Sequence, residues 1–214
     1  MKHIFWIGAF ATVASASSAL AAPTGLGFDV TARVLATGKN QMPAQTILAH
    51  VVLSGSKARI ETKSAGSRSV VLYTPPFVYR LLPESRAGVK WKLSQVKSTK
   101  FGGFDPQQLL RNPSQIRAAL LSSGAKRTGV SVLNGVPVEV FSASRPGERF
   151  SSVRAWIRRS DALPVRLEAT NGGLKVVASW SRYTRLSNVS AAQFSPPKGF
   201  AIRQMQNPPT LPLL

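Results

Sequence analysis

From residue 28 onward, most of the chain alternates between apolar and polar residues. Phe28, Val30, Ala32 and Val34 share one apolar phase, and the residues between them are mostly polar. The same alternation recurs at residues 47–53, 58–62, 89–93, 136–140, 153–157, 163–167 and 174–180. A period of two places successive side chains on opposite faces of a strand, so this pattern predicts β-strands. One apolar and one polar face per strand is typical of an antiparallel sheet that is covered on one side.

Turn-forming residues separate these runs at intervals of about 8–12 residues, as expected of an all-β chain. Asn134-Gly135 and Asn171-Gly172 suit two-residue hairpin turns that require positive φ. We therefore predict a mainly β fold, a curved antiparallel half-barrel sheet of about 9–11 strands.

One segment, residues 105–123, breaks the alternation and predicts a short helical insert. Asp105 and Pro106 fit an N-cap and a first helical position. A second helix starts at Asn112-Pro113 and ends at Gly124. The apolar face of this second helix consists of Ile116, Ala119 and Leu120. We expect the insert to lie as a lid over the apolar face of the sheet.

The first residues predict export from the cytoplasm. Residues 1–21 combine a basic start at Lys2, an apolar run over 4–14 and the small-residue ending Ala19-Leu20-Ala21, which is typical of a secretory signal peptide cleaved near Ala21. The run is shorter than the ~20 apolar residues that a membrane-spanning helix needs. We expect a single periplasmic domain at 22–205, followed by an extended tail at 206–214.

Residue types suited to catalysis are few. The chain has no cysteine, which excludes disulfides and thiol chemistry, and His50 is its only histidine beyond the predicted signal peptide. The carboxylates Glu61, Glu139 and Glu168 lie on the polar phases of predicted strands, where nearby arginines favour cross-strand ion pairs. Ser-x-x-Lys sequences occur, but they lie in turns or loops instead of opening a helix. We predict no enzyme, no metal and no cofactor.

The charge is strongly positive: 28 Lys and Arg residues against 8 Asp and Glu give a formal net charge of +20. The basic residues are spread along the chain and form no block. Such an excess indicates an anionic partner or an anionic envelope surface, and a bias of composition is the alternative. Charge alone would also permit nucleic-acid binding, but export and the isolated positions of Trp91, Trp156 and Trp180 argue against it.

Several short stretches resemble the periplasmic lipoprotein-carrier superfamily, the LolA/LolB-like proteins and their mycobacterial lipid-carrying relatives. The similar stretches are 57–61 (KARIE), 69–73 (SVVLY), 78–84 (VYRLLPE), 136–140 (VPVEV), 153–157 (VRAWI), 163–168 (LPVRLE) and 194–200 (FSPPKGF). The family's Gly-x-Leu-Trp-x-x-Arg-Pro stretch is absent, so its lid-gating arginine has no counterpart in this chain. The resemblance implies a half-open sheet of about eleven strands with helices over its concave face.

The resemblance also implies a function: a soluble periplasmic carrier that shields the acyl chains of lipoproteins or lipids from water. The residues predicted to line the cavity are Phe77, Tyr79, Leu81, Trp91, Leu93, Leu109, Ile116, Leu120 and Trp180. Those predicted to hold an anionic head group at its rim are Arg80, Lys90 and Lys92. The expected partners are the cargo and envelope membrane components, and we expect a monomer.

Two alternatives remain open from the sequence. The predicted cavity residues could simply fill a packed core. The protein could also be a basic envelope module that binds anionic lipid or lipopolysaccharide through its surface charge, with an affinity that falls as salt screens the contacts.

Overall fold

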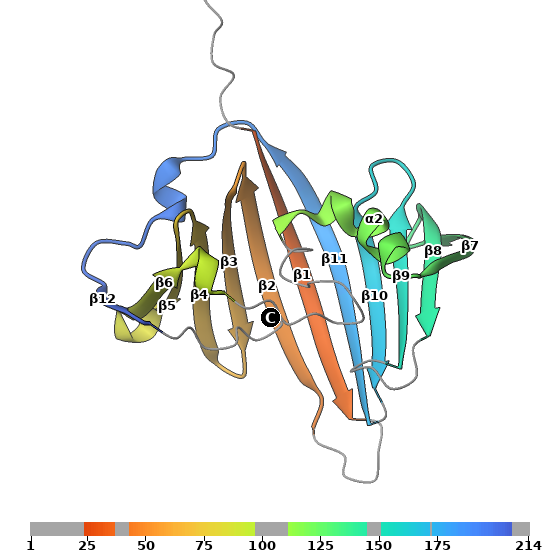
Figure 1. Ribbon diagram of the computed structural model, residues 1–214, viewed down its shortest axis with the longest axis horizontal. Coiled ribbons are helices and arrows are strands. Elements are labelled where there is room, and N and C mark those ends of the chain that lie inside the picture. Colours follow the sequence, from red (N-terminus) through yellow and green to blue (C-terminus); the bar gives the residue numbers. More distant parts are fainter. Residues whose placement is uncertain (1–23, 37–42, 97–110, 145–150, 172, 207–214) are drawn as a thin grey trace, which may run out of the picture.

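The structure is a computed structural model that describes residues 24–36, 43–96, 111–144, 151–171 and 173–206. The predicted signal peptide, residues 105–110 of the helical insert and most of the predicted tail lie outside these residues. Within them, twelve strands form one sheet and a single α-helix, α2 (Ile116–Ser122), lies against one face of it (Figure 1).

The strands follow one another along the chain with short connections. Their bounds are β1 (Gly25–Ala36), β2 (Gln45–Ser54), β3 (Lys57–Ser64), β4 (Ser67–Thr74), β5 (Phe77–Leu82), β6 (Ala87–Lys92), β7 (Lys126–Leu133), β8 (Val136–Ser144), β9 (Ser152–Arg158), β10 (Pro164–Asn171), β11 (Leu174–Leu186) and β12 (Ala201–Gln204).

The strand order across the sheet is β12-β6-β5-β4-β3-β2-β1-β11-β10-β9-β8-β7. All neighbours are antiparallel except β12 and β6, which are parallel. The two ends, β12 and β7, do not pair with each other, so the sheet is not closed. The prediction of a mainly β, half-open antiparallel sheet with a short helix is confirmed, with one strand more than the highest predicted number.

The turns follow the local sequence. Asn134 and Gly135 both have positive φ in the hairpin between β7 and β8, as predicted. Ala65 and Gly66 do the same between β3 and β4. The predicted second helix is also confirmed: Ile116 and Leu120 are fully buried on its apolar face, and Gly124 after its end has a φ of +85°.

We call the face of the sheet that α2 covers the inner face and the opposite side the outer face. One continuous hydrophobic cluster occupies the inner face. It includes Phe28, Val30, Val51, Ile60, Trp91, Ala155, Ile157, Ala178 and Trp180 from the strands, with Ile116 and Leu120 from α2. The core of the molecule therefore lies between the sheet and the segments that cover its inner face.

Strand β8 corrects one prediction. Its inner face is formed by Glu139, Phe141 and Ala143, because Phe141 pairs with Ala155 and Glu139 pairs with Ile157. The predicted apolar phase, with Val138 and Val140, lies on the outer face, where Val140 pairs with Trp156. Both valines are nevertheless buried. The apolar residues of the alternating pattern in this strand therefore lie on a covered part of the outer face.

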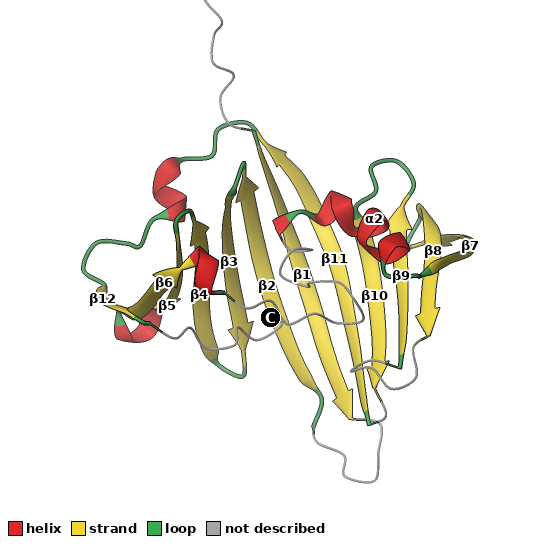
Figure 2. Cartoon of the chain, viewed as in Figure 1, coloured by secondary structure: helices red, strands yellow, loops and turns green. Residues whose placement is uncertain are grey.

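The C-terminal segment after β11 runs along the outer face and then caps one edge of the sheet (Figure 2). Phe194 from the 3-10 turn η4 (Ala191–Phe194) is buried against Val52 and Val189. Arg59 and Thr74 donate hydrogen bonds to the carbonyls of Gln193 and Phe194. The chain then forms β12 beside β6, so the β6 edge is covered.

The opposite edge, β7, is exposed along nearly its whole length. Val130 and Val132 are 57% and 67% exposed, and no strand pairs with the outer side of β7 within the described part of the chain. The two edges of the sheet are thus unequal.

Candidate functional site

A row of paired residues crosses the inner face from β6 to β11. Each member is the register partner of the next: Trp91, Val78, Tyr73, Ala58, Leu53, Leu26 and Arg185. Paired residues in an antiparallel sheet share a face. The row is therefore apolar or aromatic along its length and ends at a guanidinium.

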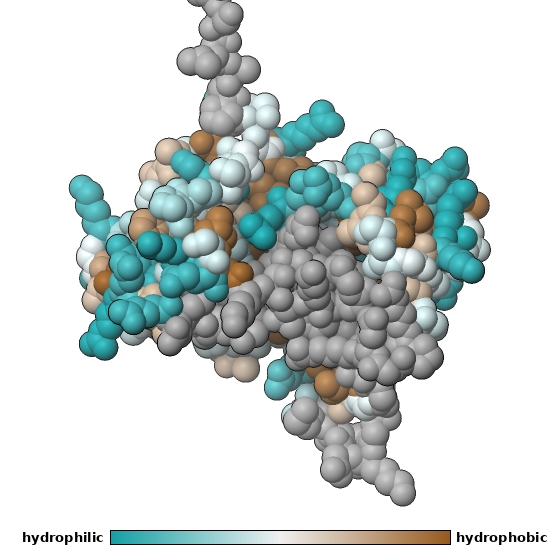
Figure 3. Space-filling view, viewed as in Figure 1, coloured by the Kyte–Doolittle hydropathy of each residue, from teal (hydrophilic) through white to brown (hydrophobic). Residues whose placement is uncertain are grey.

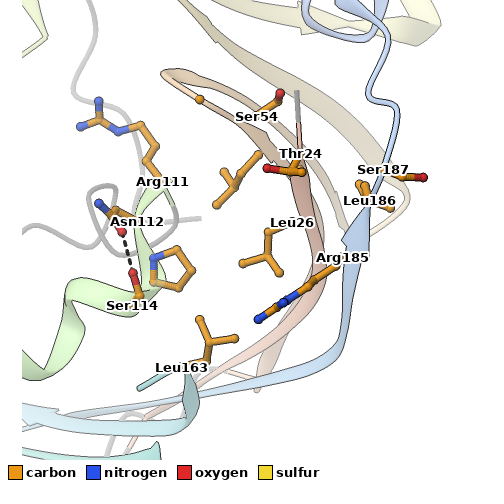
Figure 4. Close-up of a pocket in the computed structure, with 14 residues that line it drawn as sticks. Thr24, Leu26, Ser54, Arg111, Asn112, Ser114, Leu163, Arg185, Leu186 and Ser187 are labelled. Atoms are coloured by element: carbon orange, nitrogen blue, oxygen red, sulfur yellow. Dashed lines mark hydrogen bonds between the residues drawn. The ribbon is translucent and has the colours of Figure 1, made fainter. Parts of the chain in front are cut away.

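A pocket of about 610 Å³ lies at the Arg185 end of this row (Figure 4). One wall is made by the ends of β1, β2 and β11 and the other by residues 111–114 before α2. Leu26, Leu53 and Leu163 give it an apolar surface, and its volume is in the range of ~300–1,000 Å³ that is usual for small-molecule sites.

Two arginines line this pocket from opposite walls. Arg185 extends from β11 beside Leu26, and Arg111 comes from the segment before α2 (Figure 4). The Arg111 guanidinium lies over the Tyr73 ring, 4.9 Å from the ring centre, and its Nε is buried without a hydrogen-bond acceptor. Neither arginine forms an ion pair with a carboxylate of the described residues.

Two indole N–H groups on the inner face also lack acceptors. Trp91 is completely buried and Trp180 is 8% exposed, and the Nε1 atom of each is buried without a hydrogen-bond partner among the described residues. A buried donor without an acceptor costs about 1–3 kcal/mol. The inner face is therefore largely apolar, with a few donors left unused.

Helix α2 is held to the sheet by packing and by charge. Arg117 of α2 lies 2.6 Å from Glu139 Oε2, and Arg127 of β7 lies 3.2 Å from Glu139 Oε1. Glu139 was predicted on a polar phase, but the register places it on the inner face. Because the described helix has only seven residues, these contacts and the burial of Ile116 and Leu120 fix its position.

The predicted cavity residues fall on both faces of the sheet. Trp91, Trp180, Ile116 and Leu120 are buried in the inner cluster, and Leu93 packs against it. Leu81 is buried on the outer face with Val70 and Leu72, and Tyr79 packs there too. Phe77 has the phase of Tyr79, with the two ring centres 6.3 Å apart. Leu109 lies outside the described residues.

The predicted head-group residues are divided in the same way. Arg80 pairs with Val71 and Val89 and so lies on the inner face, half-buried. Lys90 and Lys92 pair with Tyr79 and Phe77 on the outer face, where Lys90 Nζ lies 5.1 Å from the centre of the Phe77 ring. None of the three lines the 610 Å³ pocket.

The pocket residues Leu26, Leu53, Leu163, Arg111 and Arg185 were not selected from the sequence. Leu26 continues the apolar phase of Phe28 and Val30, and this alternation could have predicted that Leu26 lies on the same face of the sheet. Arg185 could not be placed, because Arg182 has a φ of +54° and the β1–β11 register shifts next to it.

The outer face carries ion pairs between its strands. His50 Nδ1 lies 2.6 Å from Asp29 Oδ1, and Arg182 Nε lies 2.5 Å from Asp29 Oδ2. Burial alone would raise the pKa of Glu61, but hydrogen bonds from Arg68 and Arg59 outweigh it and lower this pKa below its ordinary value. These residues border a second hollow of about 530 Å³, lined mainly by polar side chains.

Glu168 has similar partners on β10 and β11. Burial raises its pKa, but Lys175 and Arg166 lower it further than burial raises it. The arginines of the predicted ion pairs, Arg59 and Arg166, lie two residues away on the same strands as Glu61 and Glu168, and Arg68 and Lys175 supply the cross-strand contacts. The carboxylates of Asp29, Glu61 and Glu168 on the outer face are thus engaged in structural pairs.

Over the described residues, no group of three or more His, Cys, Asp or Glu side chains could hold a metal ion. No helix in the same residues is long and apolar enough to cross a membrane.

No protein-family model matches the chain, and no curated protein matches it in sequence. Among solved structures, an uncharacterized conserved protein from Thermus thermophilus is similar over 87% of this chain and 92% of its own, with a TM-score of 0.55 and 14% identity. A LolA superfamily protein from Nitrosomonas europaea covers 80% of this chain and 90% of its own, with a TM-score of 0.41 and 10% identity.

The lipoprotein LppX from Mycobacterium tuberculosis covers 77% of this chain and 89% of its own, with a TM-score of 0.43 and 15% identity. The likeness to the Thermus protein shows a shared fold.

Proposed function

We propose that this protein is a periplasmic carrier that binds the acyl chains of a lipid or lipoprotein between the inner face of its sheet and the segment containing α2. The observation that carries the proposal is the pocket of about 610 Å³ at the end of the apolar row, where leucines of the sheet face residues 111–114. The sequence motifs that resemble the LolA-like carriers support the same function.

Only a small area of apolar contact is needed to hold an acyl chain. Each buried methylene contributes about 0.8 kcal/mol, so a few ordered carbons are enough for useful affinity. The pocket lies at the ends of β1, β2 and β11, and α2 is a short element whose displacement would uncover more of the inner face. A carrier must also release its cargo, and a short lid held by few contacts suits that requirement.

A saturable binding measurement with a fluorescent fatty acid tests the proposal. Ser114→Trp places a large side chain on an exposed residue that lines the pocket, and we expect it to weaken binding about tenfold. Gln115→Trp is the matched control, because the neighbouring residue is exposed but does not line the pocket. Circular dichroism checks that both variants fold.

The competing function is a basic envelope module that binds polyanions through surface charge. It is favoured by the excess of basic residues, since five carboxylates, Asp29, Glu61, Glu139, Asp161 and Glu168, already lie in ion pairs. Binding through apolar burial persists in 1 M salt, where the screening length is about 3 Å, whereas binding through exposed charge is lost. Absence of saturable binding at any salt concentration contradicts the carrier function.

A further inference from the structure

We propose that the outer face over β9, β10 and β11 docks on a membrane surface that contains anionic phospholipid. The docking surface is a basic patch made of five cations and one indole: Arg33, Lys126, Arg154, Arg166, Lys175 and Trp156. This patch lies on the opposite side of the sheet from the inner face. The proposal therefore stands or falls independently of the carrier function.

The strand register places the members of the basic patch near one another. One row of register partners crosses six strands on the outer face: Arg33, Val177, Glu168, Arg154, Ser142 and Lys126. With neighbouring strands ~4.8 Å apart, this row extends about 24 Å along the sheet. Arg166 and Trp156 are partners in the adjacent row, and Lys175 contacts Glu168 from β11. The patch is thus a continuous part of one face.

Most of the positive charge in the patch is not neutralised within the protein. Glu168 is the carboxylate that lies among these cations, and Arg166 and Lys175 already contact it at 2.6 and 3.1 Å. Arg33, Lys126 and Arg154 are exposed and form no ion pair among the described residues. Exposed cations without nearby carboxylates favour an anionic surface as partner.

Trp156 adds an apolar group to the centre of the patch. Its ring is half-exposed and lies between the guanidiniums of Arg154 and Arg166, which are 4.9 and 5.6 Å from the ring centre. Indole rings are enriched at the membrane–water interface, where the ring contacts apolar atoms and its N–H group remains among polar ones. A soluble polyanion offers no apolar layer to an indole, so cations around a tryptophan favour a bilayer.

The other part of the outer face is covered by the protein itself. The C-terminal segment packs against Val52 through Phe194, and against Leu72 and its neighbours through Phe200 and Ile202. These contacts cover the side of the sheet that contains β2, β4 and β5. The basic patch lies on the other side, where its cations and its indole retain their exposure to solvent.

Co-flotation with lipid vesicles measures docking. Vesicles of mixed phosphatidylcholine and phosphatidylglycerol are compared with vesicles of phosphatidylcholine alone. We expect binding to the mixed vesicles at low salt, and loss of most of it in 1 M salt, where the screening length is about 3 Å. Exported protein is used, because the apolar run at residues 4–14 would itself insert into a bilayer.

A pair of charge variants tests the location of the docking surface. Arg33→Gln with Arg154→Gln should weaken binding to the mixed vesicles about 25-fold, since each basic residue near an anionic surface contributes a factor of about five. Lys198→Gln with Arg203→Gln is the matched control: it removes the same charge from two exposed residues at the β6 edge. The control should weaken binding by less than about threefold, because charges far from the bilayer are screened.

Brominated acyl chains, which quench indole fluorescence at short range, show which tryptophan reaches the bilayer. We expect the mixed vesicles to quench Trp156, and Trp156→Phe should lose this quenching. Trp91 and Trp180 are buried on the inner face. Quenching that persists in full in Trp156→Phe would therefore come from acyl chains at the inner face, and it would contradict docking through the outer face.

Three further results would also overturn the proposal. Equal binding to the two kinds of vesicle would show that anionic lipid is not recognised. Equal losses in the two double variants would show that net charge, and not the basic patch, attracts the protein to the vesicles. If soluble polyglutamate binds as tightly as the mixed vesicles and depends equally on Arg33 and Arg154, the patch is a site for polyanions. The fatty-acid measurement at the pocket tests the carrier function separately.

Discussion

The two faces of the sheet are built from alternate residues of the same strands, yet they differ in chemistry. The inner face is a single apolar cluster that extends from Trp91 on β6 to Phe141 on β8. The outer face has two small apolar clusters, around Phe194 and around Leu72, two buried valines on β8, and ion pairs elsewhere. Hydrophilic residues gather at both ends of the sheet, over β5, β6 and β12 and over β7 and β8 (Figure 3).

This difference shows that the two sides of one sheet can be stabilised by different interactions. Ion pairs and the C-terminal segment stabilise the outer face, so its apolar residues occur where something covers them. The inner face relies mainly on apolar contacts, and its charged groups lie at particular places: Arg185 at one end, Arg80 in the β5 part, and Glu139 under α2. Substitutions on the two faces should therefore have different consequences.

The largest difference is expected between two tryptophans. Trp91→Ala removes a completely buried side chain from the inner face and should lower the free energy of unfolding by about 3–5 kcal/mol. Trp156 lies half-exposed on the outer face, with the guanidiniums of Arg154 and Arg166 4.9 and 5.6 Å from its ring centre. Trp156→Ala should cost only about 1 kcal/mol.

Urea unfolding monitored by circular dichroism measures both values. Equal losses of stability in the two variants would show that the inner face is no better packed than the outer face, which contradicts the comparison.

A smaller effect is expected for the attachment of α2. Glu139→Gln removes the charge shared by Arg117 and Arg127 and should lower the free energy of unfolding by about 1–2 kcal/mol. Amide hydrogen exchange in residues 116–122 should accelerate more than in β3 or β4. Arg127→Gln is the control, because it leaves the contact between Arg117 and Glu139 in place. Unchanged exchange in α2 would mean that the ion pair does not hold the helix.

The smallest effect is expected on the stability of the fold at low pH, where the outer-face carboxylates Glu61 and Glu168 become protonated. The pKa values of Glu61 and Glu168 are below the ordinary value of 4.5, so their ionised forms stabilise the fold above pH 4.5. That stabilisation is lost as the pH falls through the lowered values. Glu61→Gln with Glu168→Gln should remove about 1 kcal/mol at pH 7 and flatten the decline in stability below pH 4.5.

Unfolding of both proteins between about pH 7 and pH 3 measures this difference. Fatty-acid binding by the variant should be unchanged at neutral pH, since both residues lie on the outer face. Parallel stability curves for the variant and the original chain would contradict the role of these two carboxylates.

Alternation was sufficient to predict the strands whose outer face is uncovered. In β1, Phe28, Val30 and Ala32 are buried as expected, and Asp29 and Arg33 lie on the outer face. In β5 the outer phase is apolar, because Phe200 and Ile202 of the C-terminal segment cover Tyr79 and Leu81, whereas the inner phase contains Arg80. The period alone could not show which phase of β5 faces inward, and the predicted cavity set was divided for this reason.

Strands β7 and β12 were not among the alternating runs of the sequence, although the Asn134-Gly135 turn marks the end of β7. Strand β7 is exposed on both faces, so nothing selects an alternating pattern. Strand β12 has only four residues and pairs in parallel with β6, a long-range contact that depends on Gly88: a Cβ there would lie 2.7 Å from Leu81 and 3.0 Å from Ile202. The pocket joins residues 24–26, 53–55, 111–114 and 185–187, and only the folded topology brings these segments together.

The unequal edges of the sheet also limit how copies of this protein could associate. Backbone groups at a free edge can recruit another strand, and unlimited recruitment leads to fibres. Here β12 occupies one edge and only β7 is open, as far as the described residues extend. Two molecules that paired through β7 would use up the open edges of both, and growth would stop at two. Such a chain thereby avoids endless edge-to-edge stacking although its sheet is not closed.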